Sequence, residues 1–312
     1  MTERNALEIC RQLQSTLSPR IKVLQVHSVF DSAVNIIGDE LFFSVVTQRH
    51  CIYPMSCRIE GDASLIEAGV KAGMSVISSG EGIYLPQAGF SIDLHRGMEV
   101  DLSIRNLPSL SAPEKLQAKL AILLELVCTK GCEEDLSTLV TEKYRNPCAD
   151  AVKKRLPEFN KAVRDGDIQA VKLAGALAGG GIGLTPSSDD LLVGYLSVYL
   201  AHTLAIDYSC LDAAMRLTQE MGREAAKHTN LISGAFLKQC GRGLLSENMI
   251  KLIVALYSAS KEEAVRLCGE RILKFGSTSG IDMLTGVILA LLNLNEDIQP
   301  SAINGGQYCG KA

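Results

Sequence analysis

The stretch GGGIGLTPSSDDLLVGYL, residues 179–196, joins a glycine-rich loop to an apolar helix and decides how the second part of the chain is built. Thr185 is a favourable N-cap residue, and Pro186 suits the first helical position. Backbone N–H groups in the first turn of a helix lack partners, and together with the helix dipole they attract anions. Gly181 and Gly183 would let a ligand approach this backbone closely. The stretch therefore predicts a helix start that binds an anion.

Two aspartates, Asp189 and Asp190, follow Ser187 and Ser188 in the first turn of the expected helix. The helix dipole favours the ionised form of these carboxyl groups, and an ionised carboxylate only accepts hydrogen bonds. It can accept from an amide or carbamoyl NH2 group, orient a lysine, or hold Mg2+. A site for a molecule with both an anion and an NH2 group would use this combination. An ordinary helix start whose acidic residues complement the dipole has the same composition.

The pattern D-x-L-x-G, which begins at Asp190, recurs at Asp282. A glycine and a threonine precede each copy; in the second copy they are Gly276 and Thr278, and Ser279 follows them. A one-residue gap is needed to align the two copies fully. We expect the two helix starts to face each other across a pseudo-twofold axis, with Asp190 and Asp282 as matching hydrogen-bond acceptors.

A further polar segment contains His228, Thr229, Asn230 and Ser233. Thr229 or Asn230 would cap the helix that follows. Polar and cationic groups at a helix start suit an anionic substrate. A polar loop before a capped helix is the simpler interpretation of the same residues.

Composition and motifs exclude several function classes. The 312 residues are 47% hydrophobic and 21% charged, with a net charge of −4 and no tryptophan, which favours neither nucleic acid nor an anionic membrane as a partner. The ten cysteines lack zinc-site spacing, and the N-terminus does not resemble a signal peptide, so we expect reduced thiols in a cytoplasmic protein. P-loop, dinucleotide-binding, GxSxG and HExxH motifs are missing.

The chain changes character after residue 107, and the predicted fold class is α+β. Residues 21–107 contain short segments rich in Val, Ile and Phe that are separated by glycines, which predicts an antiparallel, barrel-like β domain. Residues 112–298 show helical periodicity and predict a mostly α-helical domain that carries the glycine-rich helix starts. Residues 1–20 are expected to form a helical N-terminal segment, and residues 299–312 a loose tail.

Three segments together resemble a known family. GIGLTPSSDDLLVG, HTNLISGAFL and FGSTSGIDMLTG, in this order after a β-rich first third, are similar to the AllH-type subunit of oxamate carbamoyltransferase and its uncharacterised relatives. The resemblance spans roughly residues 20–293. The family commonly has a glycine where this chain has Ser188 and a histidine where it has Ser277, and these departures bear on substrate preference.

The resemblance implies a role in purine and allantoin nitrogen catabolism. The family's reaction exchanges a carbamoyl group between oxalurate and phosphate and gives oxamate and carbamoyl phosphate. The AllH-type subunit is expected to act with two other kinds of protein, one of which resembles acyl-CoA synthetase subunits. Carbamoyl phosphate and oxamate each carry an anion and an NH2 group, so the reaction suits the predicted site.

The predicted roles follow from this chemistry. Helix N–H groups and the hydroxyl groups of Thr185, Ser187 and Thr278 would hold anionic oxygens. Asp189, Asp190 or Asp282 would accept a hydrogen bond from the NH2 group during catalysis. Two alternatives remain open at this point. One is a non-catalytic subunit that binds a small anion or a partner protein. The other is a metal-dependent enzyme for a small carboxylate, in which the three aspartates bind Mg2+; otherwise the sequence requires no cofactor. A homo-oligomer is compatible with both.

Overall fold

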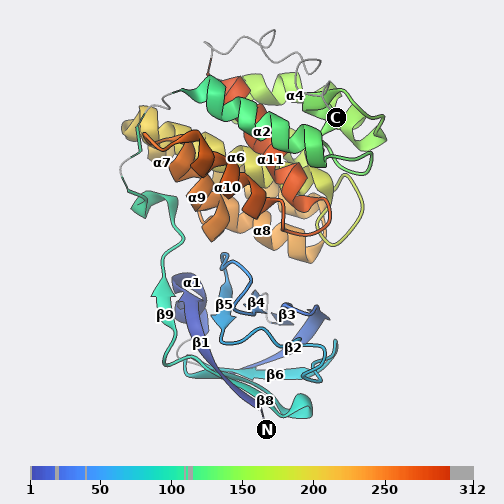
Figure 1. Ribbon diagram of the computed structural model, residues 1–312, viewed down its shortest axis with the longest axis vertical. Helices are drawn as coiled ribbons and strands as arrows, with labels where there is room; N and C mark the ends of the chain where they lie inside the picture. Colours follow the sequence, from blue (N-terminus) through green and yellow to red (C-terminus); the bar gives the residue numbers. More distant parts are fainter. Residues whose placement is uncertain (1, 18–20, 39–40, 109, 112–114, 296–312) are drawn as a thin grey trace. The chain divides into compact units, whose positions relative to one another are not determined.

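The computed structural model describes residues 2–17, 21–38, 41–108, 110–111 and 115–295 (Figure 1). It consists of two compact units, Met1–Leu102 and Ser103–Ala312. The division lies a few residues before the predicted end of the β domain, because the Ile104 amide donates to the Gly243 carbonyl group (2.8 Å) and Ser103 pairs with Leu244. The expected tail, residues 299–312, lies outside the described residues.

The first unit is a closed eight-stranded β-barrel (Figure 1). The strands pair in the order β5-β4-β3-β2-β6-β7-β8-β1, and β1 also pairs with β5, which closes the sheet and removes its free edges. A ninth strand extends the sheet beside β1. The strands are β1 (Thr2–Cys10), β2 (Lys22–Val29), β3 (Ala33–Gly38), β4 (Leu41–Val46), β5 (Ser56–Ile59), β6 (Ser75–Ser78), β7 (Gly82–Leu85), β8 (Phe90–Asp93) and β9 (Met98–Val100).

The predicted barrel-like domain is confirmed, with one difference in strand direction. Most neighbouring strands are antiparallel, as expected, but β1 runs parallel to β8 and β9, and β4 runs parallel to β5. The parallel pairs of β1 arise because this N-terminal strand lies beside β8 and β9 from the end of the unit. A connection of this kind has no local turn signal in the sequence.

The prediction of a helical N-terminal segment is wrong for residues 2–10. Thr2–Cys10 form β1, and only Arg11–Leu17 form a helix, α1. Ala6, Ile9 and Cys10 are buried in the barrel. Pairing with three other strands outweighs the weak local helix propensity of this segment.

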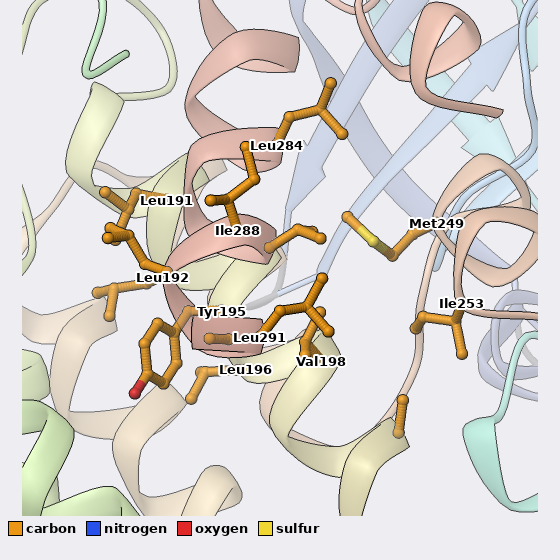
Figure 2. Close-up of a cluster of buried hydrophobic side chains, with 14 of the residues drawn as sticks. Leu191, Leu192, Tyr195, Leu196, Val198, Met249, Ile253, Leu284, Ile288 and Leu291 are labelled. Carbon is orange, nitrogen blue, oxygen red and sulfur yellow. The ribbon is translucent and has the colours of Figure 1, made fainter. Parts of the chain in front are cut away.

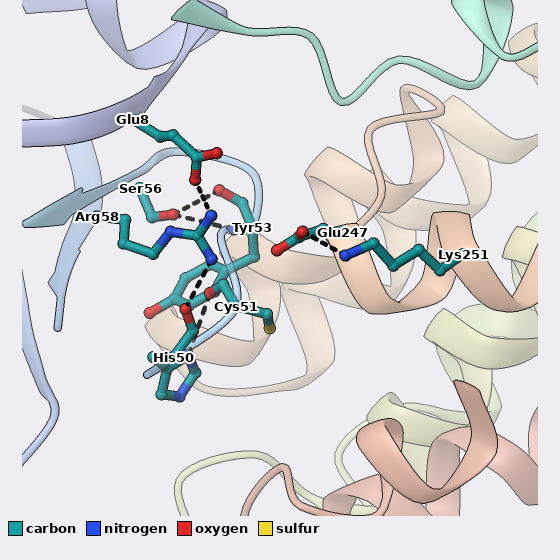
Figure 3. Close-up of polar contacts among 8 residues, drawn as sticks. All are labelled: Glu8, His50, Cys51, Tyr53, Ser56, Arg58, Glu247 and Lys251. Atoms are coloured by element: carbon teal, nitrogen blue, oxygen red, sulfur yellow. Dashed lines mark hydrogen bonds and ion pairs between the residues drawn. The ribbon is translucent and has the colours of Figure 1, made fainter. Parts of the chain in front are cut away.

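Polar contacts hold β1 against β5 where the barrel closes (Figure 3). The Arg58 guanidinium of β5 forms an ion pair with Glu8 of β1, and its Nη1 atom also donates to the His50 carbonyl group at 3.3 Å. Ser56 Oγ donates to the Tyr53 carbonyl group at 2.7 Å and stabilises the turn before β5. These contacts fix the register of the closing strand pair.

The second unit is helical, as predicted, and its described part has an isolated bridge but no strand. Ten helices, α2 to α11, lie in the described part of the range 112–298 that the sequence predicts to be mostly helical. The helices are α2 (Leu116–Lys130), α3 (Thr138–Thr141), α4 (Pro147–Arg164), α5 (Gln169–Leu177), α6 (Ser187–Ile206), α7 (Leu211–Ala225), α8 (Leu231–Gly241), α9 (Glu247–Leu256), α10 (Glu262–Ile272) and α11 (Ser279–Leu294).

Helices α6 and α11 form the centre of this unit (Figure 2). Both are buried on nearly all sides, which explains why they lack a polar face. Leu192 and Val198 of α6 and Leu284 and Ile288 of α11 are completely buried. The starts of both helices are therefore held rigidly by the core. No helix among the described residues is long and apolar enough to span a membrane.

Candidate functional site

Helices α6 and α11 cross with their backbones in direct contact. A Cβ atom placed on Gly194 of α6 would lie 2.0 Å from the Met283 carbonyl oxygen of α11. A Cβ atom on Gly286 of α11 would lie 2.0 Å from the Leu191 carbonyl oxygen of α6. The two contacts are reciprocal, since Gly194 corresponds to Gly286 in the sequence repeat and Leu191 to Met283. The expected pseudo-twofold arrangement is therefore present.

The crossing brings the first turns of both helices together. The hydroxyl oxygens of Thr185 and Ser279 lie 2.9 Å apart, in a hydrogen bond that joins the two helix starts. Thr185 was expected to cap α6, but Pro186 occupies the N-cap position without a side-chain cap bond, and the Thr185 hydroxyl group contacts Ser279. The carbonyl group of Pro186 instead accepts from the Asp189 and Asp190 amides at 2.9 and 3.3 Å. Thr185 therefore connects two elements and does not cap one.

The repeated aspartates, Asp190 and Asp282, are buried at this junction. Their exposed fractions are 3% and 0%. Asp282 Oδ1 accepts from the Leu136 amide at 2.7 Å. The Oδ2 atoms of Asp190 and Asp282 are both buried, and no hydrogen-bond partner among the described residues reaches either of them. Buried acceptors without partners are rare and costly, so this pair is the strongest candidate for a ligand-binding position.

Burial changes the protonation of both carboxyl groups. It raises the pKa of Asp190 well above its ordinary value of 3.8; nearby hydroxyl groups of Ser279 and Thr185 oppose the rise, and the carboxylates of Asp282 and Asp189 add to it. Burial raises the pKa of Asp282 to about 7, against the opposing effect of the Leu136 amide and the Ser187 hydroxyl group.

The helix dipole does not dominate the protonation of Asp190 and Asp282, because burial raises the pKa of both carboxyl groups. A dipole contributes about 0.3–1 kcal/mol at a helix start. Each pKa unit corresponds to about 1.4 kcal/mol, so the rise of Asp282 from 3.8 to about 7 exceeds the dipole effect. Burial therefore favours the protonated form of both groups.

Asp189 makes a different set of contacts. Its Oδ1 atom accepts from the Gly179 amide at 2.7 Å, and its Oδ2 atom accepts from the hydroxyl groups of Thr229 and Ser233, the latter at 2.7 Å. Both oxygens are thus engaged by the glycine-rich loop and by the start of α8. We propose that Asp189 positions the loop and does not contact substrate.

The glycine-rich loop adopts conformations that require glycine. Gly179, Gly181 and Gly183 have φ angles of 78°, 107° and 108°, in the region that side chains disfavour. The Gly180 amide donates to Ser188 Oγ at 2.7 Å, and the Ser188 amide donates back to the Gly180 carbonyl group at 2.9 Å. Residues 181–184 are exposed. The loop therefore forms an open rim beside the buried aspartates, and Gly276 (φ 64°) occupies the related position before α11.

The predicted third segment lies against this rim. Asn230 caps α8 by accepting from the Ser233 amide at 3.1 Å, and its Nδ2 atom donates to the Leu184 carbonyl group at 2.8 Å. The His228 carbonyl oxygen would be only 2.2 Å from a Cβ atom on Gly179. The His228 ring is exposed and lies 3.3 Å from Glu224. The backbone of this segment belongs to the site, while the imidazole points toward Glu224.

A fourth helix start, that of α4, contributes a residue that the sequence analysis missed. Asn146 caps α4 by accepting from the Cys148 amide at 2.9 Å. Cys148 Sγ would lie 3.0 Å from a Cβ atom on Gly180. Its pKa is raised by burial and then by the charges of Asp282 and Asp189. The sequence Asn-Pro at 146–147 signals a helix start, but nothing local shows where that start is placed.

The described residues contain no group of three or more His, Cys, Asp or Glu side chains that could hold a metal ion. Asp189 has both oxygens engaged by protein donors, so it would have to break these bonds to bind Mg2+. The site is built from helix starts, hydroxyl groups and two carboxyl groups. Such an arrangement binds a small polar molecule by hydrogen bonds.

Residues in both units match models of known protein families. Residues 177–291, which include the glycine-rich loop, α6, α8 and α11, match the description "oxamate carbamoyltransferase subunit AllH". Residues 5–100, the barrel, match the AllH family N-terminal domain. The chain belongs to the AllH family. AllH is named as a subunit, so the chain has a carbamoyltransferase subunit role and other subunits as partners.

The two AllH matches leave residues 101–176 uncovered. That segment contains Cys148 and the Leu136 amide that binds Asp282. Comparisons with curated proteins and with solved structures gave no match. The roles of individual AllH-family residues in this chain therefore rest on the geometry described above.

Proposed function

We propose that this chain binds the carbamoyl-bearing substrate of an oxamate carbamoyltransferase where α6 and α11 cross. The reaction interconverts oxalurate and phosphate with oxamate and carbamoyl phosphate, in purine and allantoin nitrogen catabolism. One observation carries the proposal: two buried carboxyl oxygens without partners, Asp190 Oδ2 and Asp282 Oδ2, lie at the junction of two helix starts.

The two carboxyl groups complement a primary amide. A carbamoyl or oxamoyl group has a carbonyl oxygen that accepts a hydrogen bond and an NH2 group that donates one. We propose that Asp190, whose pKa is raised by burial, donates to the carbonyl oxygen in its protonated form, and that Asp282 in its ionised form accepts from NH2. A carboxylate in place of the amide offers no N–H and adds a negative charge, so the pair would reject it.

The helix starts and hydroxyl groups supply the anion contacts. We propose that N–H groups of the glycine-rich loop and the hydroxyl groups of Thr185, Ser187 and Thr278 bind the carboxylate or phosphate oxygens. Ser188 and Ser279 position the loop and the helix junction. Gly181, Gly183 and Gly276 allow the backbone to turn beside the ligand.

The transfer itself needs no covalent enzyme intermediate. A phosphate oxygen attacks the carbamoyl carbon of oxalurate, and the bond from that carbon to the amide nitrogen breaks. The nitrogen of the departing oxamate gains the proton that phosphate loses, so atoms and charge balance. Hydrogen bonding to the carbonyl oxygen by Asp190 would stabilise the negative charge that develops there. The described cysteines are free, which suits the cytoplasmic location that we propose.

The test uses the complex of this chain with its partner subunits. Asp190→Leu, which removes the donor, and Asp282→Asn, which removes the ionised acceptor, should each lower the rate of carbamoyl transfer by about 10²–10³-fold, with the fold intact by thermal melting. Asp150→Asn, an exposed acidic residue in the first turn of α4, is the matched control. If the Asp190→Leu and Asp282→Asn complexes turn over normally, the proposed site is wrong. Normal turnover together with lost oxamate binding by the isolated chain would favour a non-catalytic binding subunit.

A further inference from the structure

The two unused carboxyl oxygens of the candidate site are closed off from solvent. Asp190 Oδ2 and Asp282 Oδ2 have almost no accessible surface and no hydrogen-bond partner among the described residues. The helices that carry them, α6 and α11, are buried on nearly all sides by the core of the second unit. A substrate can therefore reach these oxygens only when part of the structure that covers them moves aside.

The glycine-rich loop is an exposed part of this cover. Residues 181–184 are exposed, whereas Ser187, the first residue of α6, is buried. A Cβ atom on Gly181 would lie 2.7 Å from the Ser187 amide nitrogen. The Ser187 hydroxyl group in turn opposes the rise in the pKa of Asp282. The loop thus packs on the turn of α6 that carries Asp190 and reaches Asp282.

Glycines let this loop take more than one conformation. Gly179, Gly181 and Gly183 have positive φ angles, and glycine changes φ and ψ at little cost. Hinge segments absorb such changes when a loop opens. The nearest atom to a Cβ placed on Gly183 would be the Thr185 carbonyl oxygen at 3.9 Å, so no described residue of another element packs closely against the loop at this point.

Little apolar contact holds the loop in place. Ile182 is 80% exposed and Leu184 is 46% exposed, so lifting the loop would expose little apolar surface that is now buried. Segments with few buried apolar contacts open at a low cost in free energy. The loop can therefore move while the core beneath it stays packed.

Hydrogen bonds hold the loop in its closed position. The Gly180 amide and carbonyl groups both bond to Ser188, at 2.7 and 2.9 Å. At the other end of the loop, Asn230 Nδ2 at the start of α8 donates to the Leu184 carbonyl group at 2.8 Å. This second bond is exposed, so water can replace it when the loop lifts. The loop is thus fastened at both ends by bonds that lie outside the apolar core.

We propose that residues 180–184 form a gate, which lifts to admit the substrate to Asp190 and Asp282 and closes over it during transfer. The gate rests on the proposed function, because it takes these two aspartates as the position of the substrate. A closed gate would keep water away from the carbamoyl carbon, so that phosphate attacks in its place. The loop thus controls the rate at which a ligand enters and leaves.

A reversible lock tests the gate. Cys148 Sγ of α4 would lie 3.0 Å from a Cβ atom on Gly180, whose other close neighbours are side-chain atoms of Ser188. Gly180→Cys therefore places a second thiol where it can form a disulfide with Cys148. In the full chain, the oxidised variant should bind radiolabelled oxamate at least about tenfold more slowly than the reduced variant, measured by rapid filtration. The double variant Gly180→Cys, Cys148→Ser should not respond to the reductant, and equal rates in the two redox states of Gly180→Cys would overturn the gate.

Asn230→Ser tests the opposite change. Serine is also a favourable N-cap residue, so α8 should keep its start, but its side chain is too short to reach the Leu184 carbonyl group. The gate should then open more often, and oxamate should bind and dissociate about threefold or more faster. Ser246→Asn, which exchanges the same two residue types at the N-cap of α9, is the matched control and should change neither rate. Slower or unchanged rates in Asn230→Ser would show that this bond does not hold the gate.

Hydrogen exchange of the ligand-free chain distinguishes a failed gate from a failed function. If the loop lifts, the Gly180 and Ser188 amides should exchange about 100-fold or more faster than the Tyr195 amide in the middle of α6, and the disulfide should slow them. Equal protection at all three amides would overturn the gate whether or not oxamate binds. Fast exchange that the disulfide slows, together with no binding of oxamate or carbamoyl phosphate by the natural chain, would support the movement and overturn the proposed function.

Discussion

The hydroxyl oxygens of Thr185 and Ser279, 94 positions apart in the chain, lie 2.9 Å from each other and join the first turns of α6 and α11. The bond places two acidic residues with unused oxygens, Asp190 and Asp282, at one junction. Neither helix start alone would provide this arrangement. The chemistry of the site therefore depends on how closely the two helices cross.

Gly194→Ala should strongly destabilise the helical unit. The added Cβ atom would lie 2.0 Å from the Met283 carbonyl oxygen, which is backbone and cannot move without separating the helices. We expect a loss of about 3 kcal/mol or more in the free energy of unfolding, measured by urea denaturation. Gly175→Ala is the matched control, because its Cβ atom would meet the movable side chains of Glu224 and His228. Equal stabilities of the two variants would contradict the close crossing.

The stability of the chain should fall as pH rises from about 4 toward neutrality, through Asp190 and Asp282. Both carboxyl groups have a raised pKa in the folded state, so the folded state binds more protons than the unfolded state in this range. The contribution of the two carboxyl groups to the free energy of unfolding is greatest below the pKa that they have in the unfolded chain. For Asp282 this contribution is lost as the pH rises to about 7, its pKa in the folded state.

Asp282→Asn should remove part of this pH dependence, since the amide oxygen can still accept from Leu136 and cannot ionise. The free energy of unfolding should be measured at pH 5 and at pH 7. Its decrease between the two should be smaller in the variant than in the natural chain, by up to a few kcal/mol. Asp150→Asn should leave the slope unchanged. An unchanged slope in Asp282→Asn would show that this carboxyl group is ionised throughout.

Asp189→Asn should loosen the glycine-rich loop without unfolding the core. The substitution replaces an oxygen by an NH2 group, so at least one of the donors from Gly179, Thr229 and Ser233 loses its acceptor. Hydrogen exchange should become about tenfold faster or more at the Gly179 amide. Exchange in α9 should stay the same. Unaltered protection at Gly179 would show that Asp189 does not hold the loop.

The Cys148 thiol should report on occupancy of the candidate site. It is half-buried near Gly180, and its pKa is raised by burial, so alkylation by iodoacetamide should be slow, and saturating oxamate should slow it further, by about fivefold or more. Mass spectrometry of the Cys148 peptide measures the rate, with exposed Cys210 as the internal reference. If oxamate binds but protects neither thiol, the ligand lies away from Cys148.

Much of the fold could be predicted because its signals are local. The helices of the second unit follow from apolar periodicity and from capping residues such as Asn146 and Asn230. The barrel follows from short β-rich segments separated by glycines. Thr2–Cys10 could not be predicted, because its strand conformation depends on partners more than 45 residues away.

The candidate site could be predicted only in part. The repeat around Asp190 and Asp282 led to the pseudo-twofold crossing, since both copies keep the glycine that the contact requires. Burial depth has no sequence signal of this kind, so the raised pKa values could not be foreseen. Cys148 was missed because it reaches the site through the packing of α4 against the glycine-rich loop.

The symmetry of the crossing is incomplete, and this gives the site a direction. The axis that relates Asp190 to Asp282 also relates Asp189 to Ile281 and Ser188 to Gly280. One half carries a carboxylate and a hydroxyl group that fasten a loop, and the other half carries an apolar side chain and a glycine packed against the Ile272 carbonyl group. A molecule with two different ends, such as oxamate, would contact different residues at each end if it lay across the axis. It would therefore bind in one orientation.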